Sequence, residues 1–246
     1  MEERGPSAYI AELVGTFLLV LFVALIVSVY ARGGIQTPEF VVIGLLHAFV
    51  LMMLIQTLGG VSGAHFNPAV TIGLLSVRKI RPNEAVGYIA MQVVGAIAGA
   101  ALAKVVLDEV PGGPNLANVS VSSLIAGKTL LGALCELIGT FALVWAIMGV
   151  AVNPKGSPDW AGFVIGATLG FGVMVFAPLT GAGLNPARAL GPAIVEGDFI
   201  DGFGKFLVIY VVGPVVGGLI AALGYKALVL GPEHTAGDRP VDVLPE

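Results

Sequence analysis

Charged residues are scarce in this chain. Asp, Glu, Lys and Arg make up 11% of its 246 residues, whereas soluble domains carry about 25%. Hydrophobic residues make up 57%, so the surface cannot be mostly water-facing, and an ordinary soluble protein is excluded. The formal net charge is −4, which argues against a nucleic-acid partner.

Cysteine and histidine are also rare. Cys135 is the only cysteine, which excludes an intramolecular disulfide and a thiolate metal cluster. The three histidines, His47, His65 and His234, are scattered along the chain. No nucleophile, base or metal-ligand set accompanies them, so we predict no enzymatic activity, no metal site and no cofactor.

The chain is rich in long apolar runs that contain no Asp, Glu, Lys or Arg. Six of them reach about 18 residues, the length that a membrane-spanning helix needs. They cover residues 13–31, 40–77, 85–103, 137–154, 160–187 and 206–225. Two of these runs, 40–77 and 160–187, exceed one helix and must hold something extra. We therefore predict an all-α membrane protein with six transmembrane helices, the first of which is a retained span and not a signal peptide.

The basic residues predict how the chain is oriented. Arg78, Lys79 and Arg81 follow one another closely between the second and third spans. Cytoplasmic loops carry an excess of Lys and Arg, so this connection is placed inside, and six spans then put both termini inside as well. We expect a multi-pass protein of the cell membrane with both termini cytoplasmic.

The two halves of the chain repeat each other. Ala-Glu-Leu-Val-Gly-Thr-Phe at 11–17 returns as Cys-Glu-Leu-Ile-Gly-Thr-Phe at 135–141, and Ser-Gly-Ala-His-Phe-Asn-Pro-Ala-Val at 62–70 returns as Thr-Gly-Ala-Gly-Leu-Asn-Pro-Ala-Arg at 180–188. Each half has three spans, an odd number, so the second copy must enter the bilayer from the opposite face. We predict one domain, 1–246, with repeats at about 8–106 and 129–230, a polar connection between them and a disordered tail at 231–246.

Glycine is abundant, with 35 residues, about twice its average share. Gly95 and Gly99 of the first repeat match Gly213 and Gly217 of the second. Small residues four positions apart let membrane helices approach closely, so we interpret these positions as packing sites.

An Asn-Pro-Ala triplet stands toward the end of each overlong run, as Asn67, Pro68 and Ala69 and again as Asn185, Pro186 and Ala187. Asn is a favoured N-cap and Pro suits the first helical position, so each triplet should begin a helix. Too few apolar residues follow for a full crossing, so the two half-helices must enter from opposite faces and meet N-terminus to N-terminus. Non-helical backbone at that depth is tolerated only inside protein or beside a wet cavity. We therefore expect the extended segments 63–66 and 181–184 to flank a pore.

With these motifs, the sequence resembles the aquaporin, or major intrinsic protein, family, including its prokaryotic and archaeal members. The resemblance rests on Ser-Gly-Ala-His-Phe-Asn-Pro-Ala at 62–69 and Gly-Leu-Asn-Pro-Ala-Arg at 183–188, and it covers residue 8 to about 230. It implies an aquaporin-like bundle of six transmembrane helices plus two reentrant half-helices, related by an inverted repeat. It also implies a homotetramer in membrane lipid, with no cofactor, that passes water and small neutral solutes.

A pore of this family selects against charge. The positive ends of the two half-helices oppose cations, including hydronium, and the amides of Asn67 and Asn185 can donate to a passing water oxygen. A water held by both asparagines loses its proton-relay partners. This is the mechanism that the resemblance to aquaporin-type pores implies.

Glu12 and Glu136 occupy matching repeat positions, and a carboxylate inside the membrane is a functional candidate. An ion-coupled secondary transporter would need such groups. In the alternative, which the resemblance favours, each carboxylate accepts hydrogen bonds from the unwound segment before an Asn-Pro-Ala triplet. His65 can join the same network or act in gating.

Arg188 lies three positions after Asn185, one turn into the second half-helix. A buried unpaired arginine is costly, so we expect it to face the wet pore with its donors held by carbonyls of the preceding loop. The resemblance places His47, Val173, Ala182 and Arg188 at the outer selectivity filter. Val173 is small and apolar where strict water channels carry His, which favours a wider opening that also admits glycerol, urea or ammonia.

Other positions argue against an aquaglyceroporin-type solute channel. Ala189 and Ala193 stand where glycerol-conducting relatives carry Asp and a basic residue, and Tyr210-Val211 matches neither class. We therefore expect water to be the main permeant.

Two positions bear on mercury sensitivity. Ala182 stands where mercury-sensitive relatives have Cys, and Cys135 lies on the fourth span. We expect Cys135 to lie away from the pore and mercury to inhibit weakly at most.

Overall fold

A computed structural model describes residues 4–31, 37–110, 115–199 and 202–231 of the chain. Within this part, six helical segments are long and apolar enough to cross a membrane, as the apolar runs predicted. They are Pro6–Tyr30, Glu39–Ser62, Pro82–Val106, Thr129–Val152, Pro158–Thr180 and Phe203–Leu230. Every regular element in the described residues is helical. The predicted tail 231–246 and His234 lie outside the described residues, except for Gly231.

The first half of the chain forms helices α1 (Pro6–Tyr30), α2 (Thr37–Ser62), the short α3 (Pro68–Ser76) and α4 (Pro82–Val106). The connection contains one 3-10 turn, Ser123–Ile125, and the second half follows as α5 (Thr129–Ile147), α6 (Ala161–Thr180), the short α7 (Pro186–Glu196), α8 (Phe203–Leu207) and α9 (Gly213–Tyr225). The π-helical turns Met148–Val152, Val208–Val212 and Lys226–Leu230 extend α5, join α8 to α9 and extend α9, and a 3-10 turn, Pro158–Trp160, precedes α6.

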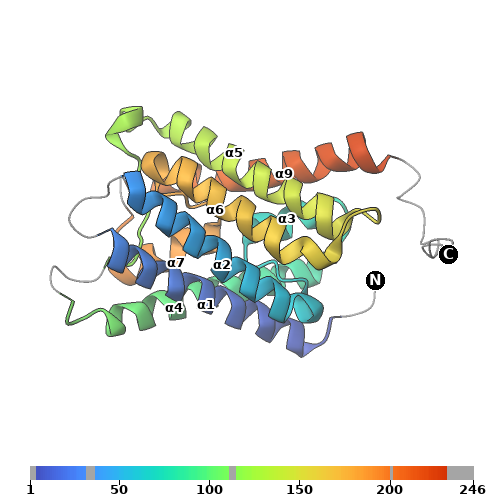
Figure 1. The fold of residues 1–246 in the computed structure, drawn as a ribbon, viewed down its shortest axis with the longest axis horizontal. Coiled ribbons are helices and arrows are strands. Elements are labelled where there is room, and N and C mark those ends of the chain that lie inside the picture. Colours follow the sequence, from blue (N-terminus) through green and yellow to red (C-terminus); the bar gives the residue numbers. More distant parts are fainter. Residues whose placement is uncertain (1–3, 32–36, 111–114, 200–201, 232–246) are drawn as a thin grey trace.

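The long helices form one elongated bundle in which α1 packs along α4, α5 along α9 and α2 along α6. Helix α1 begins and α9 ends at the same end of the bundle, which we call the near end; the opposite end is the far end (Figure 1). The short helix α3 lies toward the near end and α7 toward the far end (Figure 1). The two overlong apolar runs are thereby explained. The run 40–77 holds most of α2, a non-helical segment and α3, and the run 160–187 holds α6, a non-helical segment and the first two residues of α7.

Helix α1 begins earlier than the apolar run predicted, at Pro6 instead of near residue 13. The helix therefore includes Glu12, whose side chain is completely buried. A charged residue marks the end of a membrane span only when its side chain has to reach water. Glu12 does not have to, because the protein gives its buried carboxylate hydrogen-bond partners. A scan for uncharged runs misses a helix turn of this kind.

The matched glycines lie where helices touch backbone to backbone. A Cβ added to Gly95 of α4 would stand 2.3 Å from the carbonyl oxygen of Leu13 in α1, and one added to Gly217 of α9 would stand 2.2 Å from that of Leu137 in α5. Such distances leave no room for any side chain. The predicted packing role of these small residues is therefore what the contacts support.

The connection between the halves differs from the expected polar loop. Leu116, Ala117 and Val119 are nearly completely buried, and the Ser122 N–H donates to the carbonyl of Leu179 at the end of α6. The three buried residues pack into the bundle, whereas Leu124, farther along the connection, is 73% exposed. Only part of the connection therefore belongs to the molecule's interior.

Candidate pore

The two half-helices begin at the asparagines of the repeated triplets. Asn67 is the N-cap of α3, and its side-chain oxygen accepts from the Ala69 N–H at 2.9 Å. Asn185 is the N-cap of α7, and its side-chain oxygen accepts from the N–H groups of Ala187 and Arg188. The proline after each asparagine occupies the first helical position, where a missing N–H costs nothing.

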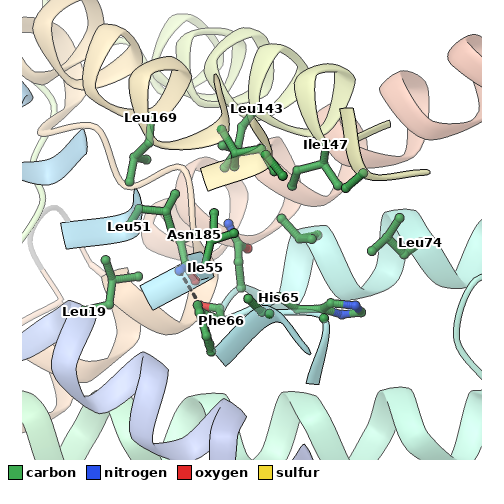
Figure 2. Close-up of a pocket in the computed structure, with 18 of the residues that line it drawn as sticks. Leu19, Leu51, Ile55, His65, Phe66, Leu74, Leu143, Ile147, Leu169 and Asn185 are labelled. Atoms are coloured by element: carbon green, nitrogen blue, oxygen red, sulfur yellow. Dashed lines mark hydrogen bonds between the residues drawn. The ribbon is translucent and has the colours of Figure 1, made fainter. Parts of the chain in front are cut away.

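Each asparagine also reaches across to the other repeat. The Asn67 side-chain nitrogen donates to the carbonyl of Leu184 at 2.9 Å, and that of Asn185 donates to the carbonyl of Phe66 at 2.8 Å (Figure 2). These two bonds hold the half-helix N-termini against each other. An amide nitrogen carries two hydrogens, so each asparagine keeps a second donor.

The sequence predicted that the segments before the half-helices are extended, and this was wrong. Three residues of each segment have left-handed backbone conformations. Positive φ angles occur at Gly63 (84°), Ala64 (51°) and Phe66 (48°). The second repeat copies the pattern at Gly181 (76°), Ala182 (49°) and Leu184 (49°). A left-handed non-glycine residue costs about 1–2 kcal/mol, so tertiary contacts must hold these segments in place. Sequence patterns for extended chain do not report this conformation.

Glu12 supplies those contacts in the first repeat. Its Oε1 accepts from the Ser62 hydroxyl at 2.7 Å and the His65 N–H at 2.9 Å, and its Oε2 accepts from the Phe66 N–H and the Gln92 amide, both at 2.7 Å. Four donors thus converge on one buried carboxylate. The expected hydrogen bonds from the unwound segment are present, and two side chains join them.

Glu136 does the same in the second repeat. Its Oε1 accepts from the Thr180 hydroxyl at 2.6 Å and the Gly183 N–H at 2.9 Å, and its Oε2 accepts from the Leu184 N–H. Tyr210 donates to the Thr180 carbonyl at 2.8 Å. Ser62 and Thr180 occupy equivalent positions in the repeat, a signal that could have identified both hydroxyls from the sequence.

A cavity of about 530 Å³ runs beside the paired asparagines. Leucine and isoleucine side chains of several helices form much of its wall, and His65, Phe66 and Asn185 lie among them in Figure 2. The cavity is lined by both asparagines, by residues 63–66, and by all four predicted filter residues, His47, Val173, Ala182 and Arg188. One passage therefore brings together residues from both repeats.

Arg188 is buried, with 6% of its surface exposed. Its guanidinium donates to the carbonyl of Ala117 at 2.8 Å. We expected the holding carbonyl in the loop directly before α7, and this was wrong, because Ala117 belongs to the buried part of the connection between the halves. That connection folds inward, so its backbone can reach a side chain 71 positions away.

The other filter candidates are also buried against the cavity. The Nδ1 of His47 lies 2.7 Å from the carbonyl oxygen of Ile43. A carbonyl only accepts hydrogen bonds, so Nδ1 carries the proton, and in the neutral ring Nε2 is left as an acceptor. Val173 and Ala182 are 3% and 4% exposed and add no hydrogen-bonding side-chain atom.

Two cations that the sequence analysis did not assign to the pore also line the cavity. They are Arg4, just before α1, and Lys79, which follows α3. None of the described lining residues is Asp or Glu, so every charged side chain among them is positive. Neither Glu12 nor Glu136 lines the cavity. The described residues also contain no cluster of His, Cys, Asp and Glu that could hold a metal ion.

Comparisons with known proteins agree with this arrangement. Residues 4–225 match the protein family described as Major intrinsic protein. The probable aquaporin AqpM of Archaeoglobus fulgidus is 38% identical over 89% of this chain and 96% of its own length. The glycerol uptake facilitator protein-like 6 of Lactiplantibacillus plantarum is 36% identical over 92% of this chain and 98% of its own. The X-ray structure of the aquaglyceroporin from Plasmodium falciparum superimposes with a TM-score of 0.76 at 23% identity, covering 91% of this chain and 96% of that one.

Proposed function

Because the chain belongs to the major intrinsic protein family, whose signature spans residues 4–225, we propose that it is a passive channel for water that also passes small neutral solutes. The protein is a multi-pass membrane protein, with six apolar helices of spanning length among its described residues. The observation that carries the proposal is the meeting of two helix N-terminal asparagines, Asn67 and Asn185, on the wall of one buried cavity.

Water crosses this centre by exchanging hydrogen bonds with the two asparagines. Each amide uses one hydrogen on the opposite repeat, on the carbonyls of Leu184 and Phe66, and offers the other to the lumen. A water oxygen that accepts from Asn67 and Asn185 points its own hydrogens away from the pair. The apolar wall gives it few competing partners, so water passes without being held tightly.

Cations are rejected by fixed positive charge. The N-terminus of each half-helix carries about half an elementary charge, and α3 and α7 aim theirs at the same place. Arg188 adds a full charge near the cavity, and none of the described lining residues offers a carboxylate in compensation. An ion would lose its water in the apolar passage without a replacement partner.

We assign the outer selectivity filter to His47, Val173, Ala182 and Arg188. Arg188 and the Nε2 of His47 can together bind an oxygen that both accepts and donates hydrogen bonds. Val173 and Ala182 leave the opposite wall small and apolar. That combination suits water first and also accommodates compact neutral molecules such as glycerol, urea and ammonia.

Stopped-flow measurements on reconstituted vesicles test both parts of this proposal. We expect wild-type protein to raise water permeability above that of empty vesicles with a low activation energy, and to raise glycerol or urea permeability more modestly. Water flux no greater than that of empty vesicles would refute the channel. Water flux with no solute crossing would refute only the solute breadth.

Two variants test the filter. Val173→His adds a bulky polar group to the small wall, so glycerol and urea permeability should fall relative to water, whereas Val173→Leu adds bulk without polarity and separates the two effects. Arg188→Val removes the charge and the bond to Ala117, so solute permeability should rise.

An ion-coupled transporter finds little support. Glu12 and Glu136, the carboxylates that would carry the ion, do not line the cavity and are saturated with backbone and side-chain donors. A proton gradient should therefore not drive solute uphill. Uphill uptake that depends on that gradient would reverse this assignment.

We further propose a single integral domain that assembles as a homotetramer in the cell membrane, with the near end in the cytoplasm. Large apolar side chains are exposed along the bundle, among them Phe49, Val86, Leu130 and Phe163, which suits lipid and subunit contacts. Arg78 and Lys79 lie between α3 and α4, where α3 ends at the near end, and this agrees with the excess of positive charge expected inside.

A further inference from the structure

Arg4 is fixed at the near end of the bundle, directly before α1. Its backbone N–H donates to Glu84 Oε1 at 2.9 Å. Its guanidinium donates to the Tyr88 hydroxyl at 2.8 Å, lies over the Tyr88 ring at 5.3 Å, and donates to the Ser62 carbonyl. These contacts reach two helices, α4 and α2, and hold the charged group on the cavity wall. The side chain is a built part of the near mouth, by which we mean the opening of the cavity beside Arg4 and Lys79.

Three nitrogen atoms converge on one point in this mouth. A Cβ added to Gly63 would lie 3.5 Å from Arg4 Nη1, 3.6 Å from Arg4 Nη2 and 3.5 Å from His65 Nε2. Gly63 has a φ of +84°, a conformation that already favours glycine. The absence of a side chain there leaves a small space bounded by the guanidinium and the imidazole.

The hydrogen bonds around His65 leave its Nε2 free to accept. Thr71 Oγ1 donates its single proton to the Asn67 carbonyl at 3.1 Å and accepts from Gln92 at 3.0 Å. His65 Nδ1 lies 3.1 Å from the same oxygen, so Nδ1 is the nitrogen that carries the proton. The positive guanidinium of Arg4 beside Nε2 favours the same tautomer.

The charge of Arg4 is not cancelled locally. The single ion pair in the described part of the chain joins Glu84 to Arg81 at 2.8 Å, so the Arg4 guanidinium forms no ion pair with a described carboxylate. Lys79 lines the same mouth. A cavity with low-dielectric walls and positive groups alone focuses a positive potential at its opening.

We propose that Arg4 and His65 form a second filter, at the near mouth, that admits neutral oxygen-bearing molecules and repels cations before they reach the asparagines. The inference rests on the proposed channel function. It pairs one arginine with one histidine at each end of the cavity, Arg188 with His47 and Arg4 with His65, although Arg4 lies outside both repeats. An oxygen between them accepts from the guanidinium and donates to Nε2. Water and hydroxyl groups do both, whereas an ammonium group can only donate and is repelled.

Charge-dependent access past Arg4 tests this filter directly. Ile55 lines the cavity beside the central residues (Figure 2), and Gly60 lines it closer to the near end, where an added Cβ meets nothing within 4 Å. Both cysteines are introduced in a Cys135→Ser background. The reaction rate at Ile55→Cys reports how much reagent has passed the near mouth, and the rate at Gly60→Cys reports how much reagent is present at the mouth itself. Anionic, neutral and cationic methanethiosulfonates of similar size are applied from the near side, and reaction rates are compared.

At each cysteine, the ratio of the anionic to the cationic reaction rate is measured. With Arg4 in place, we expect this ratio to be about fivefold or more higher at Ile55→Cys than at Gly60→Cys. Arg4→Gln keeps hydrogen-bond donors but loses the charge, so this preference should collapse. Arg4→Lys keeps the charge and should restore it, which a merely structural role for the guanidinium would not do. Lys104→Gln is the control, because Lys104 is a cation of α4 outside the cavity lining.

Water permeability of the wild-type protein and of Lys104→Gln is measured alongside and should exceed that of empty vesicles, which separates this inference from the channel assignment. If wild-type protein conducts water but Arg4→Gln leaves the charge preference unchanged, the filter is disproved. The filter would also be disproved if none of the three reagents reacted with Ile55→Cys, whether or not the Arg4 charge was present. Arg4 would then not determine which molecules enter.

Discussion

The side-chain amide of Asn67 donates to the backbone carbonyl of Leu184 at 2.9 Å, across 117 positions of the chain. Leu184 immediately precedes Asn185, so the N-cap residue of α3 is hydrogen-bonded to the residue just before the N-cap of α7. The same carbonyl also accepts from Thr140 at 3.3 Å. One bond therefore serves the fold and the pore together, because it fixes the amide whose remaining hydrogen faces the lumen.

Asn67→Asp should weaken both roles. Aspartate still caps α3, but it cannot donate to the Leu184 carbonyl and places a negative charge at the positive helix ends. We expect a loss of about 1–3 kcal/mol in the free energy of unfolding and a rise in cation permeability of reconstituted vesicles. Asn153→Asp is the matched control, since Asn153 donates to Tyr225 at 3.1 Å and does not line the cavity. Equal cation permeability in both variants would contradict the proposed barrier.

Replacing Glu12 should destabilise the protein. In Glu12→Gln, an NH2 group replaces an oxygen that accepts two of the four hydrogen bonds. Each donor left without a partner in the interior costs about 1–3 kcal/mol, so the thermal unfolding temperature in detergent should fall clearly. Glu109→Gln, at an exposed position, should leave it unchanged. A Glu12→Gln variant as stable as wild type would show that this carboxylate does not hold the segment 63–66.

Gly95→Ala should separate α1 from α4. The added methyl carbon would stand 2.3 Å from the Leu13 carbonyl oxygen, so the helices must move apart, at a cost of about 1–3 kcal/mol. Gly60→Ala, where an added Cβ meets nothing within 4 Å, should instead gain about 0.5–1 kcal/mol from the better helix propensity of alanine. Thermal unfolding of the two variants beside wild type measures the difference. If Gly95→Ala proved as stable as Gly60→Ala, the close packing would be wrong.

Mercury should act only where a thiol faces the lumen. Cys135 lies in α5, is half-buried and does not line the cavity, so wild-type water flux should resist mercuric ion, and Cys135→Ser should behave alike. Ala182→Cys places a thiol on the cavity wall and should make flux sensitive to mercury, with recovery on adding a thiol reductant. Strong inhibition of wild type that Cys135→Ser abolishes would show that Cys135 reaches the pathway.

The sequence by itself determined the features that depend on local pattern. Run length gave the six spans, the two Asn-Pro steps gave the starts of α3 and α7, and the odd number of spans per repeat required an inverted arrangement. Matching positions also singled out Glu12 and Glu136, and the family resemblance favoured a role as partners of the unwound segments over a role in ion coupling. These inferences succeed because helix capping and apolar length act over a few neighbouring residues.

Only the tertiary structure decided how distant backbone meets the cavity. It placed the Ala117 carbonyl on Arg188, set segments 63–66 and 181–184 in left-handed conformations, and brought Arg4 to the Tyr88 hydroxyl, 84 positions away. Each of these depends on contacts between segments far apart in the chain, and no local periodicity or propensity encodes such contacts. The pore lining is therefore a product of packing, because the same residue types could face lipid, protein or lumen until the helices are brought together.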